Sequence, residues 1–159
     1  MDTESVKILE KLGFRVDSSA TPGIKGHLSD DMYYDWEEVE TNYPLYLSKK
    51  DYKNTQSQDS KILEIPIATY NYAGRILRAD PVNLSSLMSA FNYYYENADR
   101  SKKPFVFVII SHSPEGTYEN GEPTKVISTM EDFLIHTKEF KDVKFVTMKE
   151  AYDFLTAIK

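Results

Sequence analysis

The sequence predicts an α/β fold with about four parallel strands that alternate with helices. Strand-like and helix-like apolar patterns follow one another in the order helix, strand, long loop, strand, helix, strand, helix, strand, helix. Val106 to His112 is a continuous apolar run, which is typical of a strand covered on both faces. Alternation of this kind implies parallel strands joined by right-handed crossovers. Four such strands make either a small open sheet or part of a barrel.

The first elements are bounded by turn signals. Thr3 to Leu12 has apolar residues at helical spacing, and Gly13 predicts the end of that helix. Phe14 to Ser19 is a predicted strand that stops before Thr21-Pro22-Gly23. Residues 24–60 show no sustained period, so we expect a long, mostly irregular loop, which in a compact domain is usually functional.

The later elements have clearer periods. Lys61 to Thr69 is a second predicted strand, and Pro66 places it at an end or edge because proline cannot donate to a ladder. The next predicted helix is opened by Asp80 and Pro81 and continues through Tyr95, and the Val106 strand follows it. A helix over Val126 to Leu134 and a strand over Val143 to Thr147 come next. The last predicted helix begins at the capping box Thr147 to Glu150 and reaches Ile158.

Composition limits the classes of function. The 159 residues fit a single domain over 1–159, and a net charge of -6 gives no basic footprint for nucleic acid. The chain has no cysteine, which excludes thiolate chemistry. No apolar run is long enough for a bilayer and the start, Met1 to Glu4, is acidic, so we expect a soluble chain without a signal peptide, cytoplasmic or of unassigned location. Twelve tyrosines suit sugar surfaces, but they are equally ordinary packing residues.

His112 is the first candidate functional residue. Ligands of parallel α/β proteins bind beyond the carboxyl ends of the strands, and His112 ends the Val106 run. The alternative is a strand-end histidine that bonds a loop carbonyl.

Serine nucleophiles have little support in this sequence. No Gly-x-Ser-x-Gly elbow is present, so Ser18, Ser19 and Ser111 are weak candidates. Phosphate-binding and dinucleotide-binding glycine motifs are absent as well.

The sequence has few clusters of residues that could ligate a metal ion. His27 with Asp30 and Asp31 forms one cluster of donor residues, although such a cluster is more often a solvated turn. His136 falls within a predicted helix, where a surface or boundary position is expected.

Three carboxylates lie near the ends of predicted strands or in the loop that feeds the same face. They are Asp17, Asp35 and Glu64. Paired acids can perform acid/base chemistry, whereas salt bridges and turn caps are the structural alternative. We expect Asp17 and Glu64 to contact a substrate and Asp35 to be catalytic.

Four stretches together resemble landmarks of polysaccharide deacetylases, the carbohydrate esterase family four. They are Gly13 to Gly23, Ile62 to Ile67, Ile110-Ser111-His112, and Phe145 to Glu150. The likeness is to members that act in surface-glycan biosynthesis. It covers nearly the whole chain but only the carboxyl-terminal half of the family.

The resemblance implies a distorted, here partial, (β/α) barrel that hydrolyses the N-acetyl group of an amino sugar with a divalent, zinc-like metal. Ile110 and His112 take the places of a Leu-x-His motif, in which the apolar residue lines the acetyl pocket and the histidine is the general acid. A departing amine needs a proton, and an imidazole titrates near neutrality.

Two further family features fall in the long loop. Asp35 and Trp36 match an Asp-Trp pair, which implies a catalytic role for Asp35 and a substrate contact for Trp36. Tyr46, with Tyr43 and Pro44, falls where relatives carry a Pro-Tyr pair on the substrate loop.

Three motifs of the family are missing from the sequence. These are the Thr-Phe-Asp-Asp motif with the base and first metal ligand, the His-x-x-x-His metal motif, and an arginine motif. We therefore expect this chain to bind no metal by itself, to be inactive alone, and to need a missing amino-terminal half or to form a homodimer. The alternatives are a noncatalytic glycan-binding or structural module derived from that fold, and an unrelated small α/β protein.

Overall fold

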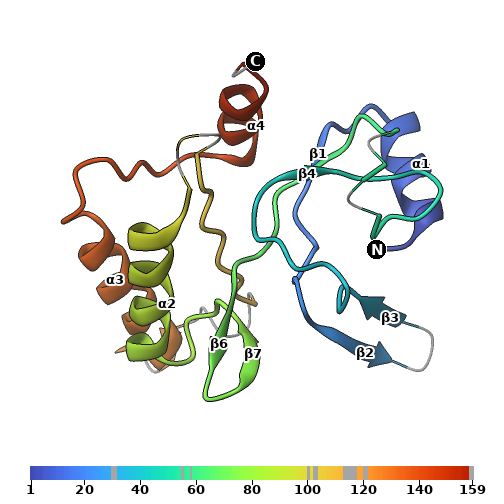
Figure 1. Cartoon of the computed structure of the whole chain (residues 1–159). Coiled ribbons are helices and arrows are strands. Elements are labelled where there is room, and N and C mark those ends of the chain that lie inside the picture. Colours follow the sequence, from blue (N-terminus) through green and yellow to red (C-terminus); the bar gives the residue numbers. More distant parts are fainter. Residues whose placement is uncertain are drawn as a thin grey trace.

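A computed structural model describes residues 1–29, 32–54, 56–57, 59–99, 101, 104–112, 118–119 and 122–157 (Figure 1). Its helices are α1 (Thr3–Lys11), α2 (Leu84–Asn97), α3 (Lys125–Thr137) and α4 (Met148–Ala157). No helix in these ranges is long and apolar enough to cross a membrane.

Local sequence explains where the helices begin. The Asp2 carboxylate accepts a hydrogen bond from the Ser5 amide at 2.7 Å and so caps α1. At α4 the Thr147 amide donates to Glu150 Oε2 at 2.7 Å, and the Glu150 amide donates back to Thr147 Oγ1 at 3.2 Å. The predicted capping box is confirmed.

Three of the predicted strand segments lie parallel to one another. β1 (Val16–Asp17) pairs in parallel with β5 (Leu63–Glu64), and Ile67 forms a parallel bridge with Val108. The Ala68 amide donates to the Val108 carbonyl at 2.9 Å. α2 lies in the chain between the bridged residues Ile67 and Val108, whereas the long loop, without a helix, joins β1 to β5.

The predicted irregular loop over residues 24–60 contains three strands. β2 (Lys25–Ser29) and β3 (Met32–Asp35) form an antiparallel hairpin, and β4 (Leu45–Tyr46) pairs antiparallel with β5. Short strands that draw their stability from tertiary neighbours leave little local signal in the sequence.

A second hairpin was not predicted at all. β6 (Thr69–Tyr72) and β7 (Arg75–Arg78) are joined by Ala73 and Gly74, whose φ angles are 51° and 82°. Two positive φ values are typical of a type I′ turn, which sequence analysis recognises by Asn-Gly or Asp-Gly. Because Ala73 stands at the first position in place of asparagine or aspartate, the sequence gives no signal for this turn. A smaller hairpin joins β8 (Tyr118–Glu119) and β9 (Glu122–Pro123).

Two predicted strands are extended but not regular. Residues 106–112 contribute the bridge at Val108, and residues 143–147 form no ladder. Phe145 and Val146 are 56% and 51% exposed, because no neighbouring segment among the described residues pairs with theirs. The ladders in the described ranges are short and mostly antiparallel, so the partial barrel remains a prediction.

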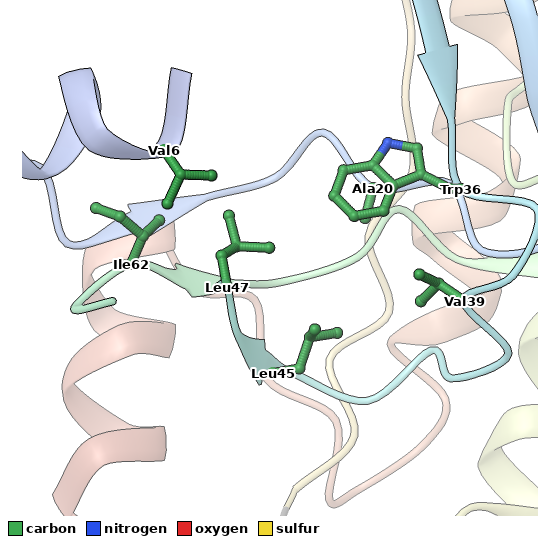
Figure 2. Packing of buried hydrophobic residues seen from close by; sticks show 7 residues of the cluster. All are labelled: Val6, Ala20, Trp36, Val39, Leu45, Leu47 and Ile62. Carbon is green, nitrogen blue, oxygen red and sulfur yellow. The ribbon is translucent and has the colours of Figure 1, made fainter. Parts of the chain in front are cut away.

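The buried side chains form three clusters. The first lies between α1, the segment after β3, and β4 and β5, with Val6 and Ile62 toward one end and Trp36 and Val39 toward the other (Figure 2). The second centres on Phe91 of α2 and packs against α3. The third joins β5 to α4 through Ala151 and Leu155.

Candidate functional site

Asp17 and Glu64 are adjacent carboxyl residues in the parallel pair. The register of β1 and β5 sets Asp17 beside Glu64, and the Glu64 side chain is completely buried. Glu64 Oε1 accepts hydrogen bonds from the Ser19 amide at 2.9 Å and the Ala20 amide at 2.8 Å. Glu64 thereby holds the turn that follows β1.

The surroundings of Glu64 favour its protonated form. Burial raises the pKa of Glu64 well above its ordinary value, and the neighbouring Asp17 charge raises it further, while the Ala20 and Ser19 amides act in the opposite direction. Glu64 Oε2 is buried and receives no hydrogen bond from the described residues. If Asp17 and Glu64 were both ionised, neither could donate a hydrogen bond to the other. If Glu64 is protonated on Oε2, its O–H can donate a hydrogen bond to the Asp17 carboxylate.

Asp17 has a second polar neighbour. The Ser19 hydroxyl donates to Asp17 Oδ2 at 2.5 Å, and Ser18 Oγ donates to the Ile65 carbonyl at 2.7 Å. Both serines therefore serve as hydrogen-bond donors that fix the end of β1. The assignment of Asp17 and Glu64 as substrate contacts remains a prediction.

Ile110 and His112 follow the bridged part of their segment. The Ile110 amide donates to the Ala79 carbonyl at 3.0 Å, and the Ile110 side chain is half-buried. His112 is exposed two residues later. The histidine thus follows a parallel-paired segment, as the sequence predicted for a strand end, and its role as the general acid remains a prediction.

The register separates His112 from Glu64. Glu64 precedes Ile67 by three residues and His112 follows Val108 by four, which makes seven residue steps across the Ile67 and Val108 bridge. Seven steps of extended backbone correspond to about 23 Å along the strand direction. The register therefore sets Glu64 and His112 at different levels along the strand direction.

Asp35 lies in an ion pair at the end of β3. Lys53 Nζ is 2.9 Å from Asp35 Oδ2, and the two side chains are 21% and 22% exposed. The hydrogen bond from Lys53 holds the pKa of Asp35 below its usual range, with the Glu37 amide as a second cause. The Tyr52 hydroxyl donates to the Asp35 carbonyl at 2.9 Å. The catalytic role of Asp35 remains a prediction, and Asp35 would have to act while paired with Lys53.

The two aromatic candidates pack inside the protein. Trp36 is 0% exposed and meets Tyr52 edge-on, with ring centroids 4.9 Å apart. Tyr46 lies opposite Leu63 in the ladder of β4 and β5 and is half-buried against the third cluster. Their predicted contact with a substrate is not tested by these positions.

The described residues contain no group of three or more histidine, aspartate and glutamate side chains that fits a metal ion. Of the predicted loop cluster, Asp30 and Asp31 lie outside the described residues, as does the side chain of His27. His136 Nε2 is 2.9 Å from Asn92 Oδ1, and the ring packs edge-on against Phe91. A donor set of one aspartate and two histidines is therefore not present in the described part of the chain, and the metal of the complete enzyme remains an expectation.

Two concave surfaces were not predicted from the sequence. One, of about 550 Å³, lies between the β6–β7 hairpin, α2 and the segment after β3, and three tyrosines line it. The other, of about 730 Å³, is an apolar groove between residues 104–109 and residues 142–155. A cluster of aromatic residues from distant segments has no local sequence signal, although the run of three tyrosines from Tyr93 to Tyr95 in an otherwise amphipathic helix is a weak one.

No family model, no curated protein and no solved structure matches this chain. The likeness to polysaccharide deacetylases therefore rests on the residues quoted from the sequence.

Proposed function

We propose that this chain is the carboxyl-terminal part of a metal-dependent polysaccharide deacetylase that acts on an N-acetyl amino sugar of a surface glycan. One observation carries the proposal. The Ile110-Ser111-His112 stretch directly follows a segment that is bridged in parallel to the β5 region, as expected at the carboxyl end of a barrel strand.

In this proposal His112 acts on the leaving group. As the amide C–N bond breaks, the departing nitrogen takes a proton from the imidazolium, and an exposed histidine can be recharged by solvent. Ile110, two residues earlier, supplies an apolar wall for the acetyl methyl group. The chain alone is inactive, because the family motifs for the base and the metal are not in its sequence.

The apolar groove supports association with further protein. Phe145, Val146 and Phe154 are each more than half exposed there, and residues 106–109 contribute half-buried side chains from the opposite side. Contiguous apolar surface of this kind usually marks a protein interface. We propose that an amino-terminal half of the barrel, or a second copy of the chain, covers it. Light scattering at micromolar concentration should then find a dimer or larger species for the isolated chain, and a clean monomer would contradict this.

The proposal is tested by reconstitution. The chain is combined with an amino-terminal half of a deacetylase of the same family that carries the missing metal motifs, zinc is added, and acetate release from N-acetylglucosamine oligomers is measured. We expect no release from the chain alone and release from the complex. His112→Gln should lower kcat about 10²–10⁴-fold, the usual contribution of a general acid.

His136→Gln is the matched control, because that histidine bonds Asn92 on the α2–α3 interface. It should leave acetate release nearly unchanged. Equal activity of the His112→Gln and wild-type complexes, or a stable complex that releases no acetate, would contradict the proposal.

A noncatalytic glycan-binding module is the second candidate function, and the tyrosine-lined surface favours it. Titration with N-acetylglucosamine oligomers separates the two. Binding without deacetylation, even after the missing half is added, would support the module.

A further inference from the structure

The tyrosine hollow, defined as the concave surface lined by Tyr70, Tyr93 and Tyr94, is separate from the predicted site residues. One wall is the β6–β7 hairpin and another is α2, which contacts β6 (Figure 1). The segment from Glu37 to Asn42 completes the lining, together with Pro22 and Gly23. Its volume of about 550 Å³ is within the range of small-molecule sites.

A hydrogen-bond network fixes the inner surface of the tyrosine hollow. Asn42 Oδ1 accepts from the Thr69 amide at 2.8 Å, and Asn42 Nδ2 is 2.8 Å from the Tyr94 hydroxyl. The Tyr94 hydroxyl in turn donates to the Thr69 carbonyl, and Thr69 Oγ1 donates to the Pro22 carbonyl at 2.8 Å. Burial raises the pKa of Tyr94 to about 12, so its ring is a neutral phenol at any physiological pH. The hollow is therefore formed before a ligand arrives.

The exposed groups of the tyrosine hollow suit an amphipathic ring. Tyr93 is 59% exposed, and Tyr70 is partly buried on the opposite wall. Tyrosine presents a flat apolar face with a polar tip, which matches a pyranose that has C–H faces and a hydroxyl rim. Asn71, Glu37 and Glu40 are exposed polar residues of the lining and can bond to such hydroxyls.

The charge of the tyrosine hollow selects among sugars. Lysine, arginine and histidine are absent from its described lining, whereas two carboxylates are present. Glu37 is paired with Lys25, but that pair is half exposed and Glu40 adds a further negative charge. An anionic ligand such as a phosphate or uronate would be repelled, and a cationic group would be attracted.

We propose that the tyrosine hollow binds an amino sugar whose amino group is free and protonated, in preference to the N-acetylated sugar. The inference rests on the proposed function, since deacetylation converts a neutral amide into an ammonium group. The hollow then holds units of the glycan that have already been deacetylated.

Binding to the chain as it exists tests the inference. Isothermal titration compares a glucosamine tetramer with the N-acetylglucosamine tetramer at low and high salt. We expect the glucosamine tetramer to bind about two- to fivefold more tightly at low salt, the contribution of an exposed ion pair. The preference should disappear in 1 M salt, where charges are screened.

Two variants with matched controls locate the binding. Tyr93→Ala should weaken both tetramers about two- to tenfold through loss of a ring contact, whereas Tyr72→Ala, at a 56% exposed tyrosine outside the hollow, should not. Glu40→Gln should abolish the preference without weakening the N-acetylated tetramer. Glu38→Gln is its control, because Glu38 is exposed but does not line the hollow.

The inference is overturned if neither tetramer binds, if both bind equally at low salt, or if the control variants have the same effect as the test variants. Its failure is distinct from failure of the proposed function, which is read from acetate release. Tetramer binding with no acetate release in the reconstituted complex would refute only the deacetylase, and release with no binding to the hollow would refute only this inference.

Discussion

Glu64 offers a direct test of how a buried carboxyl group is accommodated next to Asp17. Glu64→Gln keeps an oxygen to accept from the Ser19 and Ala20 amides and adds an N–H that can donate to Asp17. Glu64→Ala removes the acceptor and leaves both amides without it. The two variants therefore separate the hydrogen-bonding role of the side chain from its charge.

The magnitudes follow from the contacts. A buried donor left without a partner costs about 1–3 kcal/mol, and the Ser19 amide is less buried than the Ala20 amide. Truncation of the side chain also leaves a small cavity. Glu64→Ala should therefore lose about 2–4 kcal/mol of unfolding free energy. Glu64→Gln mimics the protonated acid and should lose less than about 1 kcal/mol at low pH.

The pH dependence has a definite sign. The pKa of Glu64 in the folded protein is raised above the ordinary value of 4.5, so its stabilising contribution is complete below that pH. The contribution is lost as the pH rises through the folded pKa. Above pH 4.5 the wild type should lose up to about 1.4 kcal/mol per pH unit relative to Glu64→Gln.

Urea unfolding followed by circular dichroism, in steps from pH 4.5 to pH 8, measures these differences. Asp17→Asn should shorten the pH range over which stability is lost, because burial still raises the Glu64 pKa but the second cause, the Asp17 charge, is removed. The reasoning is refuted if wild type and Glu64→Gln keep a constant stability difference over this range, or if Glu64→Gln is as unstable as Glu64→Ala.

Three further predictions concern the fold around the candidate residues. Gly23 has a φ of 78°, so Gly23→Ala should cost about 1–2 kcal/mol. A Cβ there would lie 2.6 Å from Ile76 Cδ1, but that atom ends a half-exposed side chain that can rotate away. Gly74→Ala has the same φ problem with open space and should cost about as much in urea unfolding, and a much larger cost at Gly23 would contradict this. Trp36→Ala should cost about 3–5 kcal/mol, because the side chain is fully buried. Trp36→Phe should cost much less, because the indole N–H that it removes is buried without an acceptor among the described residues. Similar Tm losses for the two variants would count against this. Asp35→Asn should lower the Tm at neutral pH, and this effect should shrink as the pH falls below 3.8 and through the depressed folded pKa, since the contribution of the Lys53 pair is complete only above 3.8; a pH-independent effect would argue against the pair.

Features with a strong local cause were predictable. The capping box at Thr147 and the helical spacing of the apolar residues in α2 are set within a few residues, and α4 begins where expected. The start of α2 was predicted wrongly: the helix begins at Leu84 rather than at Asp80 and Pro81, because the Asn83 side chain accepts from the Ser86 amide and caps it. The parallel bridge between Ile67 and Val108 agrees with the expectation of parallel strands on either side of a helix, since α2 lies between them in the chain. The parallel pairing of β1 with β5 spans the long loop and depends on tertiary contacts.

The sequence predicted candidate residues but not their arrangement. The sequence proposed Asp17, Glu64, Asp35 and His112 as functional residues, but it could not say which of them lie together. Their separation depends on strand register, and register is a property of tertiary pairing. The ion pair between Asp35 and Lys53 likewise joins two parts of a segment that showed no period.

The sequence by itself determined the helices, apart from the start of α2, and the placement of His112 after an apolar run. The tertiary structure decided that Asp17 and Glu64 form a carboxyl pair, that residues 143–147 join no strand ladder with the described residues, and that three tyrosines line one hollow. The physical reason is the sequence separation over which the interactions act. Caps and periods act over a few residues, whereas register, burial and the pKa of Glu64 depend on side chains that the chain brings together over more than forty residues.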